Sequence, residues 1–272
     1  MLKNEDEKIL ALLHDIVEDT NYTLEDVAAL GFQDLSESLD CLSRKKDETY
    51  AQFVSRIMKS RIAVKVKVAD IKHNLSRIDS LPEHERGLAD RYKKWLPVLE
   101  KELKRERIIA AHAGTGKASL AKQYPEKFID FVSMPYKYIL PKKYEENDSE
   151  SCKANLDYQP NMDWPYNYRD AILAQLNKSD KMLLVPPDWR LLYMLYVAEV
   201  PYMLCYPENT AEAKAAYRKR YKDRGNSKSF LKLFIDGWDN FMHFLEKDDN
   251  CSRKLILKPH QFLADVVEEI CK

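Results

Sequence analysis

Residues 107–119 read RIIAAHAGTGKAS, and this stretch decides the fold of the second half of the chain. A short apolar run ends at two glycines, Gly114 and Gly116, and a helical pattern begins at Lys117. Glycines between a strand and a helix let backbone N–H groups turn toward a phosphate, and the start of the helix adds a positive dipole. The stretch therefore predicts a phosphate-binding loop. The alternative is a tight strand-to-helix turn with a surface lysine.

Beyond this stretch, short apolar runs alternate with helical patterns. The predicted strands are residues 107–112, 127–132, 181–185, 201–206 and 253–257. The predicted helices are residues 117–123, 167–175, 189–198, 210–246 and 260–270. Strands that alternate with helices form a parallel sheet through right-handed crossovers. We therefore predict a three-layer α/β domain with a mainly parallel sheet over residues 107–272, and we expect residues 144–163, which lack periodicity, to be a mobile loop or insertion.

The loop in its strand–loop–helix context resembles that of the P-loop NTPases, and residues 107–272 are similar to the nucleotide-kinase-like branch of that family. The resemblance implies that a nucleotide binds together with magnesium and that Lys117 bridges its β- and γ-phosphates. Two positions depart from the pattern, because Ala111 replaces the usual first glycine and Ala118 replaces the usual magnesium-binding Ser or Thr. The residues that we expect to contact phosphate are Gly114, Thr115, Gly116, Lys117 and Ser119.

Further polar residues follow the predicted strands of this half. Asp130 matches the position where nucleotide kinases place an acceptor-binding or base carboxylate; the alternative is a solvated acid at a strand end. Arg218, Arg220 and Arg224 lie on a basic helical segment where such kinases carry a lid that neutralises the transferred phosphoryl group. The alternative for these arginines is a solvated basic face. Residues 188–190 (Asp-Trp-Arg) open a helix on the ligand side of an α/β fold, and no role is assigned to them.

The first half of the chain carries a second pattern, LLHDIVEDT at residues 12–20 and VADIKHN at residues 68–74. If each segment is one helix, spacings of four residues put pairs of polar side chains on one face. Carboxylate oxygens suit hard divalent cations, imidazole suits manganese, iron or zinc, and further carboxylates can activate a water. The pattern predicts a metal site. The alternative is a helix start with solvated acids and a capping pair.

This pattern resembles the metal-dependent HD hydrolases, and within them the RelA/SpoT-type alarmone hydrolases, over about residues 5–100. Other segments that carry the resemblance are residues 23–27, 42–46, 48–50, 56–57 and 63–74. The implied roles are manganese binding by His14, Asp15 and Asp70, assistance to the attacking water by Glu18 and Asp19, and nucleotide contact by Asn74. The implied reaction removes the 3′-pyrophosphate of guanosine tetra- or pentaphosphate. The family has an earlier histidine ligand, whereas none of the 13 residues before His14 is a histidine, so we expect an incomplete hydrolase site.

Composition indicates a soluble globular protein with much helix, since 45% of the residues are hydrophobic and 32% are charged. Basic and acidic residues number 44 each, and zero net charge argues against bulk attraction to nucleic acid as the main role. No apolar run approaches the about 18 residues of a membrane span, and the acidic start is unlike a signal peptide. The 5 scattered cysteines indicate reduced thiols rather than a zinc cluster. We therefore expect a cytoplasmic protein with no membrane partner.

Together these patterns predict an all-helical HD-type domain over residues 1–83, a linking helix over 84–106 and a P-loop domain over 107–272. Helix breaks are expected near residues 21–23, 31, 46–47 and 82. The hypothesis is a protein of nucleotide or phosphate metabolism that joins a hydrolase-like half to a kinase-like half, with guanosine or adenosine phosphates as partners. The alternatives are a nucleic-acid end-healing kinase–phosphatase and a non-catalytic nucleotide-binding regulatory protein. The oligomeric state stays open.

Overall fold

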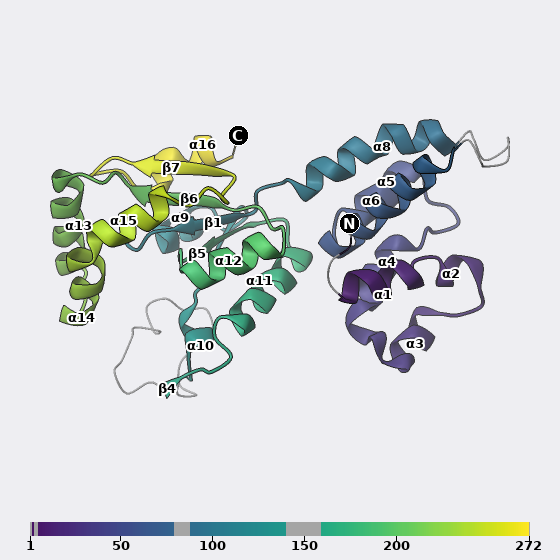
Figure 1. Cartoon of the computed structure of the whole chain (residues 1–272), viewed down its shortest axis with the longest axis horizontal. Helices are drawn as coiled ribbons and strands as arrows, with labels where there is room; N and C mark the ends of the chain where they lie inside the picture. Colours follow the sequence, from purple (N-terminus) through teal and green to yellow (C-terminus); the bar gives the residue numbers. More distant parts are fainter. Residues whose placement is uncertain (1, 3–4, 79–87, 140–158, 272) are drawn as a thin grey trace. The chain divides into compact units, whose positions relative to one another are not determined.

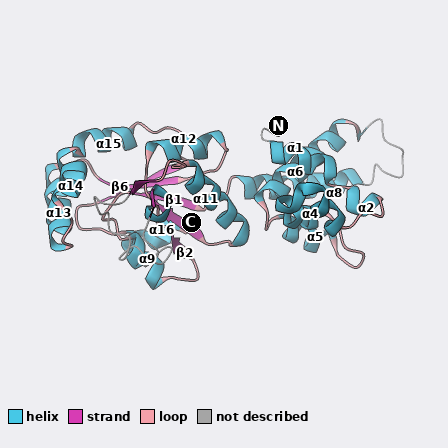
Figure 2. Cartoon of the chain, turned by 90° about the horizontal axis from the view of Figure 1, so that it is seen from below, coloured by secondary structure: helices cyan, strands magenta, loops and turns pink. Residues whose placement is uncertain are grey.

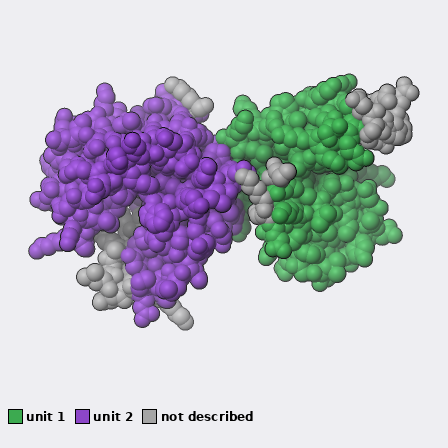
Figure 3. All heavy atoms as spheres, viewed as in Figure 1, with its two compact units in different colours: residues 1–105, 176–179 green, residues 106–175, 180–272 purple. Residues whose placement is uncertain are grey.

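The computed structural model describes residues 2, 5–78, 88–139 and 159–271. The chain divides into two compact units, residues 1–105 with 176–179 and residues 106–175 with 180–272 (Figure 3). The helix break expected near residue 82 and most of the loop expected at residues 144–163 lie outside the described residues.

The first unit is built from helices (Figure 1). They are α1 Glu5–Leu13, α2 Ile16–Asp19, α3 Leu24–Val27, α4 Ser36–Leu42, α5 Tyr50–Ile57, α6 Arg61–Ser76 and α8 Leu88–Leu103, with a π-helical turn over Ala28–Phe32 and a 3-10 turn over Gln33–Leu35. Side-chain caps fix several starts. Thr23 and Asp26 form a reciprocal capping box at α3, and Thr49 and Ser60 cap α5 and α6. Gly31, with φ of +98°, bends the chain at a predicted break.

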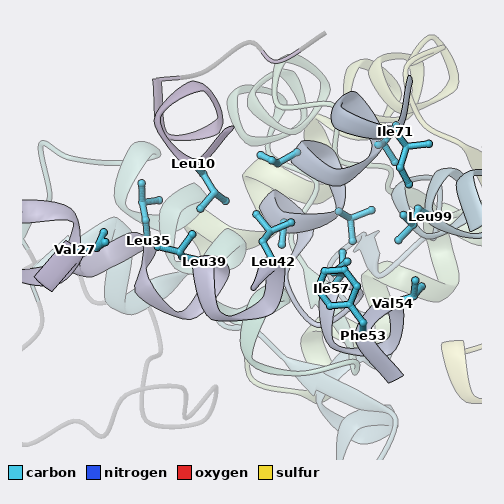
Figure 4. Packing of buried hydrophobic residues seen from close by; sticks show 14 residues of the cluster. Leu10, Val27, Leu35, Leu39, Leu42, Phe53, Val54, Ile57, Ile71 and Leu99 are labelled. Atoms are coloured by element: carbon cyan, nitrogen blue, oxygen red, sulfur yellow. The ribbon is translucent and has the colours of Figure 1, made fainter. Parts of the chain in front are cut away.

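Buried aliphatic and aromatic side chains from six of these helices form the core of the first unit (Figure 4). Members of this core are Leu10, Leu39, Leu42, Phe53, Ile57, Ile71 and Leu99. Helix α8, which covers the described part of the predicted linking helix, contributes Leu99 and also holds α6 through an ion pair of 2.7 Å between Glu100 and Lys72. Burial of a leucine side chain contributes about 2 kcal/mol, so α8 is a packed member of this unit.

The second unit is built on a five-stranded sheet in the order β2-β5-β1-β6-β7. The strands are β1 Ile108–Ala111, β2 Phe128–Asp130, β5 Met182–Val185, β6 Met203–Pro207 and β7 Arg253–Leu257. Every neighbouring pair in this sheet is parallel, which confirms the predicted mainly parallel sheet. Figure 2 shows the strands in the middle of the unit with helices on both sides.

The helices of the second unit largely follow the predicted alternation. They are α9 Lys117–Gln123, α10 Met134–Lys137, α11 Tyr166–Lys178, α12 Trp189–Val197, α13 Ala211–Asp223, α14 Lys228–Leu231, α15 Trp238–Glu246 and α16 Val267–Ile270. A π-helical turn spans Lys232–Asp236, a 3-10 turn spans Leu263–Val266, and a short antiparallel pair joins β3 Tyr138–Ile139 to β4 Gln159–Pro160.

One predicted helix start in this unit is wrong, and one helical stretch is divided. The stretch expected over residues 210–246 is interrupted, because Gly225 takes φ of +69° and Asn226 N donates back to Tyr221 O, a left-handed helix end. Ser227 then caps the start of α14. The helix expected over residues 260–270 starts later, because Phe262 is extended, with φ of −125° and ψ of 168°.

Strand β1 occupies the centre of the sheet, between β5 and β6. The chain leaves β1 through α9 to reach β2 on one side, and later crosses to β6 and β7 on the other side. The loop after β1 therefore lies where the order of strands reverses. In open α/β sheets, ligands bind at this point, beyond the carboxyl ends of the strands.

Candidate functional site

The loop between β1 and α9 contains two glycines in a backbone conformation that other residues disfavour. Gly114 has φ of +80° and Gly116 has φ of +93°, both in the left-handed region that residues with a Cβ disfavour. Gly116 also stands at the N-cap of α9. A Cβ at Gly114 would lie 2.8 Å from Tyr221 Cε1, so this position also has no room for a side chain.

The carbonyl groups of residues 111–115 in this loop are all hydrogen-bonded. Donors from α9, α13 and the turn before α16 reach the carbonyl oxygens of residues 111–115. These hydrogen bonds are Lys117 Nζ to Ala111 O at 2.7 Å, Thr115 Oγ1 to His112 O at 2.8 Å, Tyr221 Oη to Ala113 O at 2.8 Å, Arg220 Nη1 to Gly114 O at 2.8 Å and Leu263 N to Thr115 O at 2.9 Å.

The N–H groups of the same loop are left without acceptors. In a trans peptide each N–H points opposite to the preceding C=O, so each N–H group that follows a bonded carbonyl points away from the donor that holds that carbonyl. Within the part of the chain that the structure describes, the N–H groups of Ala113, Gly114 and Gly116 have no hydrogen-bond acceptor. Unpaired N–H groups cost free energy unless a ligand accepts from them, and successive inward N–H groups form an anion-binding concavity.

Lys117 adds a positive charge beside these N–H groups. Its ammonium donates to Ala111 O at 2.7 Å and to His112 O at 3.3 Å. Burial lowers the pKa of Lys117 to about 8, although Asp130 and Cys205 act in the opposite direction. Burial likewise raises the pKa of Asp130, which Lys117 and Arg224 lower. An anion in the loop would supply the charge compensation that the ammonium lacks.

His112 is a member of this site that the sequence argument did not single out. Its ring is completely buried and makes edge contacts with aromatic rings of α13, α15 and the turn between them. These rings belong to Tyr217, Phe234, Trp238 and Phe241. Its Nδ1 lies 2.9 Å from Ala113 O and 3.3 Å from Tyr221 Oη. A histidine at the end of an apolar strand was the available signal, but its aromatic neighbours are more than a hundred residues away in sequence.

Burial lowers the pKa of His112 to about 3, so this histidine is neutral in the folded protein at pH 5. The unfolded chain takes up the proton near pH 6.5, and stability is therefore lost as the pH falls from 6.5 toward 3. His112→Phe keeps an aromatic ring in the cluster but removes the titrating group. Between pH 7 and pH 4, we expect the free energy of unfolding to fall by about 3 kcal/mol less in His112→Phe than in the wild type. Urea unfolding at several pH values measures this difference. Parallel pH profiles for the two proteins would contradict it.

The predicted lid arginines lie in different surroundings. Arg220 reaches the loop, where Nη1 donates to Gly114 O. Arg224 is exposed at the end of α13, yet its charge acts on both Asp130 and Lys117. Arg218 is exposed and lies 3.9 Å from Asp236. The structure therefore brings Arg220 and Arg224 toward the loop and pairs Arg218 elsewhere.

The remaining predicted loop residues differ in what they offer. The Thr115 side chain is buried and its hydroxyl donates to His112 O. Ser119 is exposed on α9, and Ala118 offers no oxygen. The side chains at positions 118 and 119 therefore do not form an evident magnesium ligand, and no chemical step is assigned to that ion.

The predicted metal ligands of the first unit lie near one another, but not on one helix. The single helix expected over residues 12–20 is wrong, because α1 ends at Leu13 and α2 begins at Ile16, with His14 and Asp15 in the break. His14 Nε2 lies 2.9 Å from Asp15 Oδ2 and 3.8 Å from Asp70 Oδ1.

The oxygens of Asp70 already have partners. Asn74 donates to Asp70 Oδ1 at 2.8 Å, and the Lys67 ammonium lies 2.9 Å from Asp70 Oδ2. Glu18 accepts from the backbone N–H of Arg44, and Asp19 is exposed at the end of α2. Among the described residues, no group of three or more His, Cys, Asp or Glu side chains is arranged to hold a metal ion. The arrangement therefore does not fit a manganese ion, and no step is derived through one.

No protein-family model matches the sequence, and no curated protein matches it. Within the described residues, no helix combines the length and the apolar character that crossing a membrane requires.

Proposed function

We propose that the second unit is a P-loop domain that binds the phosphate groups of a nucleoside triphosphate in the loop after β1. The observation that carries the proposal is the pattern of the loop backbone, in which the carbonyl groups are hydrogen-bonded while, among the described residues, the N–H groups of Ala113, Gly114 and Gly116 have no acceptor. A tight turn with a surface lysine would give neither a set of free N–H donors nor an ammonium with a lowered pKa.

The charges around the loop favour a kinase-like role for this domain. Lys117 would contact the β- and γ-phosphates, because its ammonium lies at the loop and can exchange carbonyl acceptors for phosphate oxygens. Asp130 is the last residue of β2 and is electrostatically coupled to Lys117, so it can accept a proton from a bound hydroxyl. Arg224 supplies a further positive charge to a transferred phosphoryl group.

A non-catalytic nucleotide-binding role is the second candidate, and Ala118 favours it. Ala118, which follows Lys117, has no side-chain oxygen. The protein therefore lacks the usual side-chain partner of the nucleotide's magnesium. Such a domain could bind ATP or GTP and signal its presence without turning it over.

Calorimetric titration of the whole protein with ATP, GTP and inorganic pyrophosphate, with and without magnesium, tests the binding proposal. We expect micromolar binding of at least one of them. An assay for ADP or GDP release then separates the two candidates, because a kinase-like enzyme releases the diphosphate and a regulatory protein does not. No binding of any of these compounds would overturn the proposal for this unit.

For the first unit, we propose an HD-type domain related to the hydrolases of guanosine tetraphosphate, with an incomplete metal site and with His14, Asp15 and Asp70 as what remains of its centre. Its support is the approach of His14 to both aspartates, whose metal-binding arrangement is not formed. The test is incubation of the protein with manganese and guanosine tetraphosphate, with pyrophosphate release as the readout. No release would support an incomplete site, and release that is lost in Asp70→Asn would contradict it.

A further inference from the structure

The guanidinium of Arg220 is held by the protein itself, between two aromatic rings and two backbone carbonyls. Its guanidinium carbon lies 4.3 Å from the ring centre of Tyr217 and 4.0 Å from that of Phe262. Nη1 donates to Gly114 O at 2.8 Å, and Nη2 donates to Pro259 O at 3.2 Å. One side chain therefore joins the phosphate loop, helix α13 and the turn after β7.

From these contacts we propose that Arg220 is a positioning residue, which sets the shape of the phosphate loop and does not itself contact phosphate. The role rests on the proposed function, since it concerns the loop that is proposed to bind phosphate. Two aromatic rings flank the guanidinium, and each of its terminal nitrogens is bonded to a carbonyl. A guanidinium held in this way has little freedom to swing toward a transferred phosphoryl group.

The hydrogen bond to Gly114 O has a defined effect on the loop. The peptide bond after Gly114 is planar. Holding its oxygen toward Arg220 therefore turns Thr115 N–H to the opposite side, away from that guanidinium. That N–H has only a long contact of 3.4 Å, to His112 O. The adjacent residue Tyr221 holds the preceding peptide through Ala113 O at 2.8 Å. Neighbouring residues of α13 thus orient consecutive peptides of the loop.

The proposal divides the work of α13 between two arginines one helical turn apart. Arg220 orients the loop, whereas Arg224 is exposed and acts through its charge on Lys117 and Asp130. Arginine suits the first task because it is planar, makes two directed hydrogen bonds and stacks on aromatic rings, and lysine cannot replace it there. A role that depends only on charge should instead tolerate lysine.

The test compares Arg220→Lys with Arg218→Lys, since both substitutions keep the charge and Arg218 is exposed on the same helix, 3.9 Å from Asp236. In the absence of any ligand, we expect hydrogen–deuterium exchange of the amides of residues 112–118 to rise about tenfold or more in Arg220→Lys and to change less than about twofold in Arg218→Lys. Pyrophosphate affinity should fall about tenfold in Arg220→Lys and less than about threefold in Arg218→Lys. Wild-type exchange and affinity in Arg220→Lys would overturn the proposal.

A second variant and an added ion keep the test informative. Phe262→Leu retains the arginine but removes one stacking ring, so loop exchange should rise there as well, even if a position-220 variant folds poorly. Guanidinium ion added to Arg220→Ala should slow loop exchange toward the wild-type rate, whereas methylammonium should not. Equal effects of the two ions would contradict positioning by a planar donor. Because exchange is measured without ligand, these results stand apart from whether the loop binds phosphate, which wild-type titration with pyrophosphate decides alone.

Discussion

Lys117→Met is expected to weaken the binding of ATP by about a hundredfold, which corresponds to about 3 kcal/mol, and to abolish any release of ADP. The ammonium of Lys117 sits at the base of the phosphate loop, 2.7 Å from Ala111 O, in surroundings that lower its pKa to about 8. A phosphate there would meet a poorly compensated cation, and charge-assisted contacts of this kind are stronger than neutral ones. Calorimetric titration measures the loss.

The matched control is Lys122→Met, which removes an exposed ammonium from the same helix. We expect its ATP affinity to stay within about threefold of wild type, because a solvated charge contributes little. The melting temperature of Lys117→Met should stay close to that of wild type, since the substitution also removes the cost of burying an ammonium. Equal effects of the two substitutions would argue against the phosphate loop.

The pKa of Lys117 also sets the direction of a pH dependence. Bound phosphate stabilises the charged ammonium, so affinity should be nearly constant below pH 8 and should fall as the pH rises from 8 to 9.5. Without ligand the sign is opposite, because the unfolded lysine holds its proton up to about pH 10.4 and stability rises through the same interval. Of the groups that face Lys117, Cys205 has its pKa raised to about 12 by burial and stays protonated there. Lys117→Met should show no such decline in affinity.

The regular elements of the second unit could be predicted because local patterns decide them. Four-residue apolar runs became the central strands, and the predicted helix over residues 117–123 matches α9. The donors that hold the loop could not be predicted. Arg220, Tyr221 and Leu263 follow the loop by more than a hundred residues, and their contacts exist only once α13 and the last turn pack against it.

In the first unit, the resemblance to the HD hydrolases implied which residues would approach one another but not which partners they would have. His14 does lie near both Asp15 and Asp70. The four-residue spacing placed Asp70 and Asn74 on one face, where they are hydrogen-bonded, but the sequence argument did not predict that the Lys67 ammonium would pair with the other oxygen of Asp70. Lys67 lies one turn before Asp70 on the same helix, so the same periodicity that favours a metal ligand also supplies it with an internal cation.

Gly114→Ala is expected to destabilise the second unit by about 2–4 kcal/mol and to abolish detectable ATP binding. Two costs combine at this position. A left-handed backbone is unfavourable for alanine, and the added Cβ would lie 2.8 Å from Tyr221 Cε1, so α13 or the loop must shift. Either movement breaks the hydrogen bonds from Arg220 and Tyr221 that orient the carbonyl groups of Gly114 and Ala113. Urea unfolding and calorimetric titration measure the two effects.

Gly225→Ala separates these costs, because Gly225 has φ of +69° but no atom within 4 Å of an added Cβ. This variant should lose only about 1–2 kcal/mol of stability, which is the cost of placing alanine in a left-handed backbone conformation. Its ATP affinity should stay within about threefold of wild type. The difference between the two variants then isolates the close approach of α13 to the loop. Equal losses of stability and ATP affinity in Gly114→Ala and Gly225→Ala would contradict this prediction. The loop would then not depend on the close packing of α13, and the contacts of Tyr221 and Arg220 with the loop would not affect phosphate binding.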